Sequence, residues 1–466
     1  MKILFVLPRD SSDYGHKPVG ISILSAIAKK HGYETKLMDT GFYKHEYSIT
    51  GYDKQYTDLG MFKPVSYDGL EIPPVVARSL EDITRDYLYD FKPDIVAISL
   101  YFPFDRIAKE VIRVTKHFDP NITVIMGGPQ VTADPESALR LGADYVNVGG
   151  GMVSWEKILK GEADIEAIGN IGYMMEGEMI LNHLLPLMTN LDDLPYLDYS
   201  IYEPRHFLKA FDGKVYRGGD YMITWGCPNK CSYCINHYYK KLYKDQGLRY
   251  PVRRFSVNRA IDELIYLKNT YDLEFFKFCD ENFLLMNEEK LERFVWLYKE
   301  TVGLPFTTAV HPKTVTKRKV ALLKAMGCVS LSIGIENGSG DYRKKVLKRS
   351  DSIYDVVSAF ALARNAGIRT MAFNMGATPF YTRELYDLTV ELNQLAKPDV
   401  STMSLYMPLP GTELAQIAED NGFLEDNWKE NMGLDYLENP ILKFENLSGE
   451  EIREMRMTFQ GRIKEG

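Results

Sequence analysis

The chain alternates short apolar runs with helical patterns, and this alternation limits the folds that it can adopt. In its first part, the runs "KILFVLP" (2–8) and "PDIVAISL" (93–100) are separated by helical patterns such as "GISILSAIAKKHG" (20–32). Strands separated by helices indicate a parallel sheet, because parallel strands need a long crossover connection. The pattern predicts the α/β fold class, with a doubly wound domain over residues 1–165 whose ligands lie beyond the carboxyl ends of its strands.

Residues 166–220 show no steady period, and the stretch "LPLMTNLDDLPYLDYSIYEP" predicts a linker wrapped on a surface. The alternation then resumes with the strand "YMITW" (221–225) and continues to "TMSLYMP" (402–408), which makes six βα units. Six units predict a partial barrel over residues 221–415, because a full barrel has eight. We expect a C-terminal helical segment in residues 416–466.

The composition is that of a globular chain and excludes some classes of function. The 466 residues are 45% hydrophobic and 26% charged, and the formal net charge is -8 with a pI near 5.7. A general nucleic-acid binder usually has a basic face, so we expect no nucleic-acid partner. No apolar run reaches membrane-spanning length, and the start "MKILFVLPRD" lacks a signal-peptide cleavage site. We therefore expect no membrane span and a cytoplasmic location.

Three of the five cysteines lie within eight positions, in the stretch "TWGCPNKCSYC". A structural zinc site normally has four ligands from paired C-x-x-C elements, and the sequence has no second pair. Three thiolates, at Cys227, Cys231 and Cys234, instead suit three irons of a four-iron cluster whose fourth iron has no protein ligand. Cys279 and Cys328 stand alone in predicted strands, where we expect them to be core residues.

This C-x-x-x-C-x-x-C motif, directly after the first strand of a βα barrel, resembles the radical S-adenosylmethionine (SAM) superfamily. The resemblance implies that the three cysteines are catalytic residues and the metal ligands of a 4Fe–4S cluster. The open iron of the cluster would bind the amino and carboxylate groups of SAM. An electron from an external low-potential donor would then cleave SAM and give a 5′-deoxyadenosyl radical.

Four later segments are similar to this superfamily in the same order: "KFCDENF", "SIGIENGS", "MAFNMGATPFYT" and "LYMPLPGTEL". In the family, an aromatic residue before the last cysteine packs near the adenine, and carboxylates at strand ends hydrogen-bond the SAM ammonium and ribose. A basic residue on a following helix contacts the SAM carboxylate. The SAM-binding residues that the resemblance implies are Tyr233, Asp280, Glu281, Glu336, Arg349 and Asn374.

The first domain and the linker resemble the radical SAM enzymes that carry an N-terminal, Rossmann-like cobalamin-binding domain. The segments "PDIVAIS", "VIMGGPQVTADPESALRLGADYVNVG" and "LDDLPYLDYS" match that group in order and spacing. In it, the lower face of cobalt is empty or covered by a side chain from the loop after the third strand, and glycine-rich loops approach the cofactor closely. The cobalamin-binding residues that this implies are Tyr101, Phe102, Gly127, Gly128, Pro129, Gln130, Gly149, Gly150 and Gly151.

The chain departs from the cobalamin-binding pattern at two places. It lacks the Asp-x-His-x-x-Gly motif whose histidine ligates cobalt in methionine-synthase-type domains, as radical SAM relatives often do. Where those relatives usually read G-E-G-E, this chain has "GGGM" (149–152). The resemblance implies three cofactors: a 4Fe–4S cluster, SAM and cobalamin.

The resemblance implies a class B radical SAM methyltransferase that methylates an unactivated carbon of a small-molecule or lipid-like substrate. Radical cyclisation, ring contraction or rearrangement, with cobalamin as electron carrier or absent, is a second interpretation. A third is a corrinoid or iron–sulfur binding protein without catalysis, which the carboxylates at successive strand ends disfavour. The Tyr- and Gly-rich segment 40–80 either covers a ligand or lies on the surface.

Overall fold

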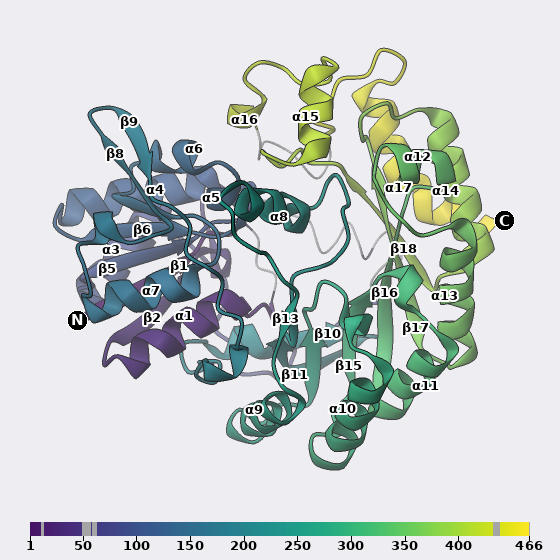
Figure 1. Cartoon of the computed structure of the whole chain (residues 1–466), viewed down its shortest axis with the longest axis horizontal. Helices are drawn as coiled ribbons and strands as arrows, with labels where there is room; N and C mark the ends of the chain where they lie inside the picture. Colours follow the sequence, from purple (N-terminus) through teal and green to yellow (C-terminus); the bar gives the residue numbers. More distant parts are fainter. Residues whose placement is uncertain (11–13, 49–56, 58–62, 432–438, 466) are drawn as a thin grey trace. The chain divides into compact units, whose positions relative to one another are not determined.

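The computed structural model describes residues 1–10, 14–48, 57, 63–431 and 439–465, and it divides into two compact units (Figure 1). The first unit contains Met1–Asp53, Tyr67–Leu208 and Tyr238–Pro251, and the second contains Lys54–Ser66, Lys209–His237 and Val252–Gly466. Each unit has its own seven-stranded sheet. The chain passes from one unit to the other more than once.

The first sheet has the strand order β2-β1-β5-β6-β7-β8-β9, and its first five strands pair in parallel. Their bounds are β1 Lys2–Leu7, β2 Glu34–Asp39, β5 Ile95–Ser99, β6 Thr123–Gly127 and β7 Tyr145–Asn147. The helices of this unit are α1 Val19–Lys30, α3 Leu80–Phe91, α4 Asp105–Phe118, α5 Pro129–Ala133, α6 Pro135–Leu139 and α7 Gly151–Lys160. A short parallel pair, β3 Tyr43–Lys44 and β4 Val76–Ala77, stands apart from this sheet. The predicted doubly wound α/β domain is confirmed.

Strand β1 and helix α4 show why these residues form this sheet. Residues 3–7 of β1 are at most 1% exposed, as expected for a central parallel strand with helices on both faces. Helix α4 buries Ile107, Val111 and Val114 on one side and places charged residues on the other. This is the pattern of a helix packed against a sheet.

The sheet continues beyond residue 165, into the range predicted as a linker. Strands β8 Ile171–Met175 and β9 Glu178–Leu181 add an antiparallel hairpin next to β7. Glu176 and Gly177 form its two-residue turn at φ values of 52° and 88°, the sign that a type I′ turn requires. The hairpin is hard to read from the sequence because its strands are short and Glu-Gly is less typical of this turn than Asn-Gly.

The second sheet has the order β10-β11-β14-β15-β16-β17-β18, and six of its strands pair in parallel. These six are β11 Lys214–Tyr221, β14 Phe275–Phe278, β15 Phe306–Val310, β16 Cys328–Glu336, β17 Arg369–Gly376 and β18 Val400–Leu405, and the edge strand β10 is Leu208–Phe211. The helices between them are α9 Val257–Thr270, α10 Glu288–Thr301, α11 Lys317–Met326, α12 Gly340–Lys345, α13 Ile353–Asn365 and α14 Arg383–Ala396. The predicted six-unit partial barrel is confirmed (Figure 1).

The first barrel strand differs from the predicted range 221–225. Strand β11 ends at Tyr221, and the residues after it form β12 Thr224–Trp225, which pairs antiparallel with β13 Arg253–Arg254. The sequence "KVYRGGDY" hides β11 because glycine and charged residues are depleted in strands. The remaining helices are α8 Ile235–Asp245, α15 Glu413–Asp420, α16 Trp428–Asn431 and α17 Gly449–Glu465.

A buried ion pair lies at the carboxyl ends of β1 and β2. Arg9 donates two hydrogen bonds to Asp39, from Nε at 2.9 Å and from Nη2 at 2.6 Å. The ring nitrogen Nε2 of His206 lies 3.2 Å from the same carboxylate. Burial raises the pKa of Asp39, but Arg9 and His206 outweigh burial and hold this pKa well below its usual range. The pair therefore fastens the segment around His206 to the first sheet.

We expect Asp39→Asn to destabilise the folded chain by about 3–5 kcal/mol at neutral pH, because it leaves Arg9 buried without its counter-charge. Folding lowers the pKa of Asp39, so its stabilising effect is present above the unfolded pKa and is lost as the pH falls. The difference between wild type and variant should therefore shrink below about pH 4. Urea unfolding measures this difference, with the exposed Asp90→Asn as the control. A difference in unfolding free energy that is the same at every pH would contradict the lowered pKa of Asp39 in the folded chain.

Candidate active site

The cysteine loop follows β12 and is held in the second unit by Ser232. The backbone N–H and the hydroxyl of Ser232 donate hydrogen bonds of 3.1 and 2.6 Å to carbonyl groups in residues 346–347. Cys227 and Cys231 are buried, and Cys234 is half-buried. The three predicted cluster ligands therefore stand on a supported backbone.

The cysteines do not converge on one point. Among the described residues, no three Cys, His, Asp or Glu side chains are arranged as ligands of a single metal ion. A 4Fe–4S cluster takes one thiolate per iron, so its ligands stand around the cluster instead of meeting at one ion. Burial raises the pKa of the Cys231 thiol to about 11, with Arg349 acting against it. Bound iron would favour the thiolate form through its positive charge.

Asp280 lies in the wall of the barrel, beneath the cysteine loop. It is 2% exposed, and its two oxygens accept hydrogen bonds from the backbone N–H groups of Ile223 (3.1 Å) and Thr224 (2.7 Å). Burial raises its pKa to about 7, although these hydrogen bonds oppose the shift. The structure thus gives Asp280 a role in holding the segment that leads into the cysteine loop, whereas the sequence suggested contact with SAM.

Glu281, the next residue, is on the opposite side of the extended chain and is exposed. Its carboxylate interacts with the backbone N–H of Gly226 and with the side chain of Asn236, which flank the cysteine loop. Of the two predicted carboxylates after β14, Glu281 is therefore the one that a ligand can reach.

The guanidinium of Arg349 contacts two other predicted SAM residues. Its Nη1 lies 3.0 Å from the Tyr233 hydroxyl and 3.2 Å from Glu336 Oε1. Its Nη2 donates to the Gly334 carbonyl at 2.9 Å, and Nε donates to Asp351 Oδ1 at 3.0 Å. The structure brings Tyr233, Glu336 and Arg349 together at the end of the cysteine loop.

Glu336 ends β16 in the left-handed region, with φ at 64°. A non-glycine residue in this region costs of order 1–3 kcal/mol, and such strain concentrates at active sites. The carboxylate lies over Gly334, where an added Cβ would be 2.4 Å from Oε1, so a larger residue at this position would displace the Glu336 carboxylate. Burial raises the pKa of Glu336, and Arg349 opposes this shift.

Two residues that the sequence did not single out complete this network. Asp351 contacts Arg349, Arg343 (3.0 Å) and His311 (3.2 Å), and it is 6% exposed. Burial raises the pKa of Asp351, but His311 and the two arginines outweigh burial and hold this pKa well below its usual range. In the sequence Asp351 is part of a polar segment before a helix, and no pattern marks it or His311 as part of a site.

Asn374 lies on the helix side of β17 and is buried. Its side chain exchanges hydrogen bonds with Asn393 of α14 and donates to the Thr402 carbonyl at 3.0 Å. The structure therefore does not bring Asn374 to the group around Arg349. The neighbouring Phe373, on the opposite face of the strand, is 40% exposed.

In the first unit, the loops after β5 and β6 carry the predicted cobalamin contacts. Gly127 ends β6, and Gly128 has φ of 110°; a Cβ on Gly128 would lie 2.6 Å from the Leu100 carbonyl oxygen. After Pro129, Gln130 is 5% exposed, and its Oε1 has no hydrogen-bond partner among the described residues. An orphaned buried acceptor next to a glycine-defined loop fits a ligand with amide donors, which cobalamin carries.

Tyr101 and Phe102 follow β5 and are both half-buried. Part of each side chain is therefore accessible to a ligand. Their role toward cobalt stays a prediction.

The glycines of "GGGM" contact a tyrosine of the same unit. The Gly150 N–H donates to the Tyr243 hydroxyl at 2.8 Å, and a Cβ on Gly149 would lie 2.6 Å from that oxygen. A Cβ on Gly150 would lie 2.5 Å from Leu187, and Gly151 begins α7. Tyr243 is completely buried. These glycines therefore have a packing role in this chain, next to the role toward a cofactor that the sequence predicted for them.

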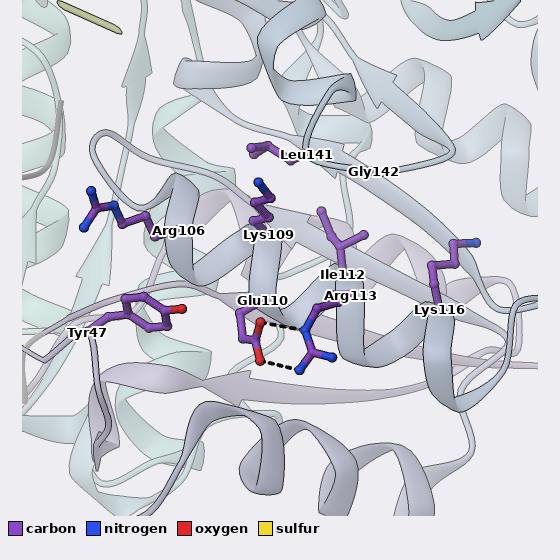
Figure 2. A pocket seen from close by; sticks show the side chains of 9 residues that line it. All are labelled: Tyr47, Arg106, Lys109, Glu110, Ile112, Arg113, Lys116, Leu141 and Gly142. Atoms are coloured by element: carbon purple, nitrogen blue, oxygen red, sulfur yellow. Dashed lines mark hydrogen bonds and ion pairs between the residues drawn. The ribbon is translucent and has the colours of Figure 1, made fainter. Parts of the chain in front are cut away.

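A groove of about 660 Å³ lies along α4 in the first unit (Figure 2). It is lined by Tyr47, Arg106, Lys109, Glu110, Ile112, Arg113, Lys116, Leu141 and Gly142. Glu110 pairs with Arg113 at 2.7 Å, and Lys116 pairs with Asp144 at 2.5 Å. The groove contains none of the residues predicted to bind a cofactor.

Fold and site together define a class: a doubly wound domain and a six-stranded partial barrel with a three-cysteine loop next to a carboxylate and an arginine. The radical SAM superfamily model matches residues 221–392, and the B12 binding domain model matches residues 8–159. The chain is a radical SAM enzyme with an N-terminal B12-binding domain. These two domains support the three predicted cofactors, a 4Fe–4S cluster, SAM and cobalamin.

The chain is similar to several known proteins over most of its length. It is 26% identical over 375 residues to an uncharacterized methyltransferase of Pyrococcus horikoshii, covering 78% of this chain and 77% of the relative. It is 23% identical to the anaerobic magnesium-protoporphyrin IX monomethyl ester cyclase of Rubrivivax gelatinosus, covering 72% of this chain and 60% of the cyclase.

Among solved structures, the radical SAM methyltransferase TsrM from Kitasatospora setae has the same fold. Its TM-score with this chain is 0.67 at 15% identity, and the match covers 91% of this chain and 76% of TsrM. In the part of the chain that the structure describes, no helix has the length and apolar character to cross a membrane.

We expect Asp280→Asn to destabilise the apo protein by about 1–3 kcal/mol at pH 5, because one backbone N–H then loses its acceptor. Folding raises the pKa of Asp280 from 3.8 to about 7, so its protonation stabilises the fold below the unfolded value, and this effect is lost as the pH rises. The difference between wild type and variant should therefore shrink as the pH rises from about 4 to about 7. Urea unfolding tests this, with the exposed Asp262→Asn as the control. A difference that grows with pH would show that the native carboxylate is preferentially charged.

Glu336→Gln keeps the size of the side chain and removes its charge. With the cluster rebuilt, we expect SAM binding to weaken roughly 10- to 100-fold, the effect of losing a hydrogen bond to a charged group. Equilibrium dialysis with labelled SAM measures the affinity, and iron content shows that the cluster is intact. Glu300→Gln, on the exposed side of α10, is the matched control. Unchanged binding and cleavage of SAM in the Glu336 variant would remove Glu336 from the site.

Proposed function

We propose that this enzyme methylates an unactivated carbon of a small-molecule substrate, with SAM as the radical source and cobalamin as the methyl carrier. The observation that carries the proposal is the group of Cys231, Tyr233, Glu336 and Arg349. SAM has an ammonium and a carboxylate at its methionine end, and this group offers both opposite charges. Arg349 and Glu336 both act electrostatically on the Cys231 thiol, so the two charges lie close to a cluster ligand.

When bound, the cluster and SAM supply the radical, and cobalamin supplies the methyl group. The residues of the chain bind and orient these groups. Arg349 holds the carboxylate of SAM, Glu336 and Glu281 accept hydrogen bonds from its ammonium and ribose hydroxyls, and Tyr233 packs near its adenine. In the first unit, the buried Oε1 of Gln130 accepts a hydrogen bond from an amide of cobalamin.

The proposal includes an external low-potential electron donor, because reductive cleavage of SAM consumes an electron that no residue of the chain supplies. The small-molecule substrate binds on the open side of the barrel, since ligands of such barrels lie at the carboxyl ends of the strands. A reducing compartment such as the cytoplasm suits a cluster with an open iron.

Radical cyclisation or rearrangement is the second candidate function. The 23% identity to a magnesium-protoporphyrin IX monomethyl ester cyclase over 72% of this chain favours it. The two candidates differ in what happens to the methyl group of SAM.

We expect the reconstituted enzyme, given SAM with a labelled methyl group and its substrate, to release a product that carries the label. The label distinguishes methylation from cyclisation, since both consume SAM as a radical source. Mass spectrometry of the product measures it, and Cys234→Ala, which removes one cluster ligand, should give no product. A product formed without the label would rule out methylation and favour the cyclase.

A further inference from the structure

Helices that connect the strands of the second sheet lie along one of its faces, the covered side, and we call the opposite face the open face. Figure 1 shows α9, α10, α11, α13 and α14 along the covered side. Phe278 of β14 packs against Phe294 and Tyr298 of α10, so it points to the covered side. Because successive side chains of a strand alternate between faces, Lys277 and Cys279 point to the open side.

A row of polar side chains crosses this open face at one level. Register pairs Asp220 of β11 with Lys277 of β14, Lys277 with Thr307 of β15, Thr307 with Ser330 of β16, and Ser330 with Arg369 of β17. We call these five residues the polar row. Lys277 is exposed, and the side chain of Arg369 is 28% exposed, although both stand on strands inside the sheet. Solvent or a ligand therefore reaches this level of the open face.

Contacts around the row show that its members share one face. Lys209 of the edge strand pairs with Asp220 at 2.8 Å, and its stem lies over Gly218, where a Cβ would be 2.6 Å away. The Cys279 thiol lies 3.6 Å from Asp220 Oδ1. Arg369 lies over the ring of Phe211 at 5.9 Å, and both Arg369 and Lys63 lie near the carboxylate of Asp212.

Several cations lie around the row. Lys209 pairs with Asp220, and Lys63 and Arg369 both lie near Asp212. Lys277 is next to Asp220 in register and is exposed. Cations on an accessible face raise the local concentration of anions.

On β17, the open face becomes apolar toward the carboxyl end of the strand. Met371 and the exposed Phe373 stand on the same side of β17 as Arg369, two and four residues nearer to its carboxyl end. Glu281 is four residues beyond Lys277 along the chain, which corresponds to about 13 Å in an extended strand. The face thus has a cationic end and, about 13 Å away, an end with the SAM-binding carboxylates.

We propose that the polar row is a subsite for an anionic group of the substrate, a carboxylate or a phosphate, held by Lys277 and Arg369. This inference rests on the proposed function, since it places the substrate on the open face of the barrel. The charged group sits at the polar row, and the carbon that reacts lies toward Glu281 and Glu336, at about the level of Phe373. The substrate class is a small molecule with one anionic end.

The test uses the full chain with its cluster rebuilt and with no turnover. Lysine amines are labelled with ¹³C by reductive methylation, and the Lys277 signal is assigned by its loss in Lys277→Arg and in Lys277→Gln. Sodium phosphate and sodium acetate are the probes, with acetamide as the neutral control. Lys299, exposed on α10, is the matched control lysine and is assigned through Lys299→Arg.

We expect a saturable shift of the Lys277 signal with one or both anions, no shift with acetamide, and only a linear salt effect at Lys299. Saturation with phosphate alone identifies a phosphate group, and saturation with acetate alone identifies a carboxylate. A Lys277 signal that follows Lys299 with both anions would overturn the proposal. The titration involves no methyl transfer, so a negative result at Lys277 would not contradict the proposed methylation. Conversely, an unlabelled product in the methyl-transfer assay would not contradict the anion subsite.

Discussion

The site depends on the buried guanidinium of Arg349. It bonds to a tyrosine of the cysteine loop, to the carboxylate that ends β16, to a carbonyl within β16 and to Asp351. A buried charge is costly unless its donors are matched, and removing one partner of such a network typically costs about 3–5 kcal/mol. The network therefore couples the position of the cysteine loop to that of Glu336. SAM has both a carboxylate and an ammonium at its methionine end. These groups can replace part of the contacts between Arg349 and Glu336, so that neither side chain is left with an unpaired charge.

Adjacent residues of β14 show how much of the site the sequence contains. In "FFKFCDE", Phe276, Phe278 and Asp280 share one parity, and Lys277, Cys279 and Glu281 share the other. The aromatic parity marks the covered face, so the sequence already contains the signal that separates Asp280 from Glu281. For β17 the same rule gives no answer, because "RTMAFNMG" has apolar residues at both parities. Only the contacts with Asn393 reveal which way Asn374 points.

The fold was predictable where the hydrophobic pattern repeats, and less so where long-range packing decides. The parallel strands of both sheets follow from their alternation with helices, whereas the hairpin β8–β9 depends on a turn with a weak signal. The "GGGM" glycines looked like a cofactor loop, but Tyr243, more than ninety residues later, packs against two of them. No local pattern connects these positions. Asp351 and His311 were missed for the same reason.

Two neighbouring carboxyl groups after β14 have opposite surroundings, and this division fits the chemistry expected of the site. Burial raises the pKa of Asp280 to about 7, and its oxygens serve two backbone N–H groups of the wall. Glu281 is exposed toward the ligand side, where a charged carboxylate can accept from an ammonium. If the two positions were exchanged, the carboxylate that binds the ligand would be buried, and the carboxyl group that supports the barrel wall would be exposed. Because side chains of β14 and the residues after it alternate between two faces, the supporting Asp280 and the ligand-binding Glu281 point in opposite directions. Lys277 points to the same face as Glu281, about 13 Å from it.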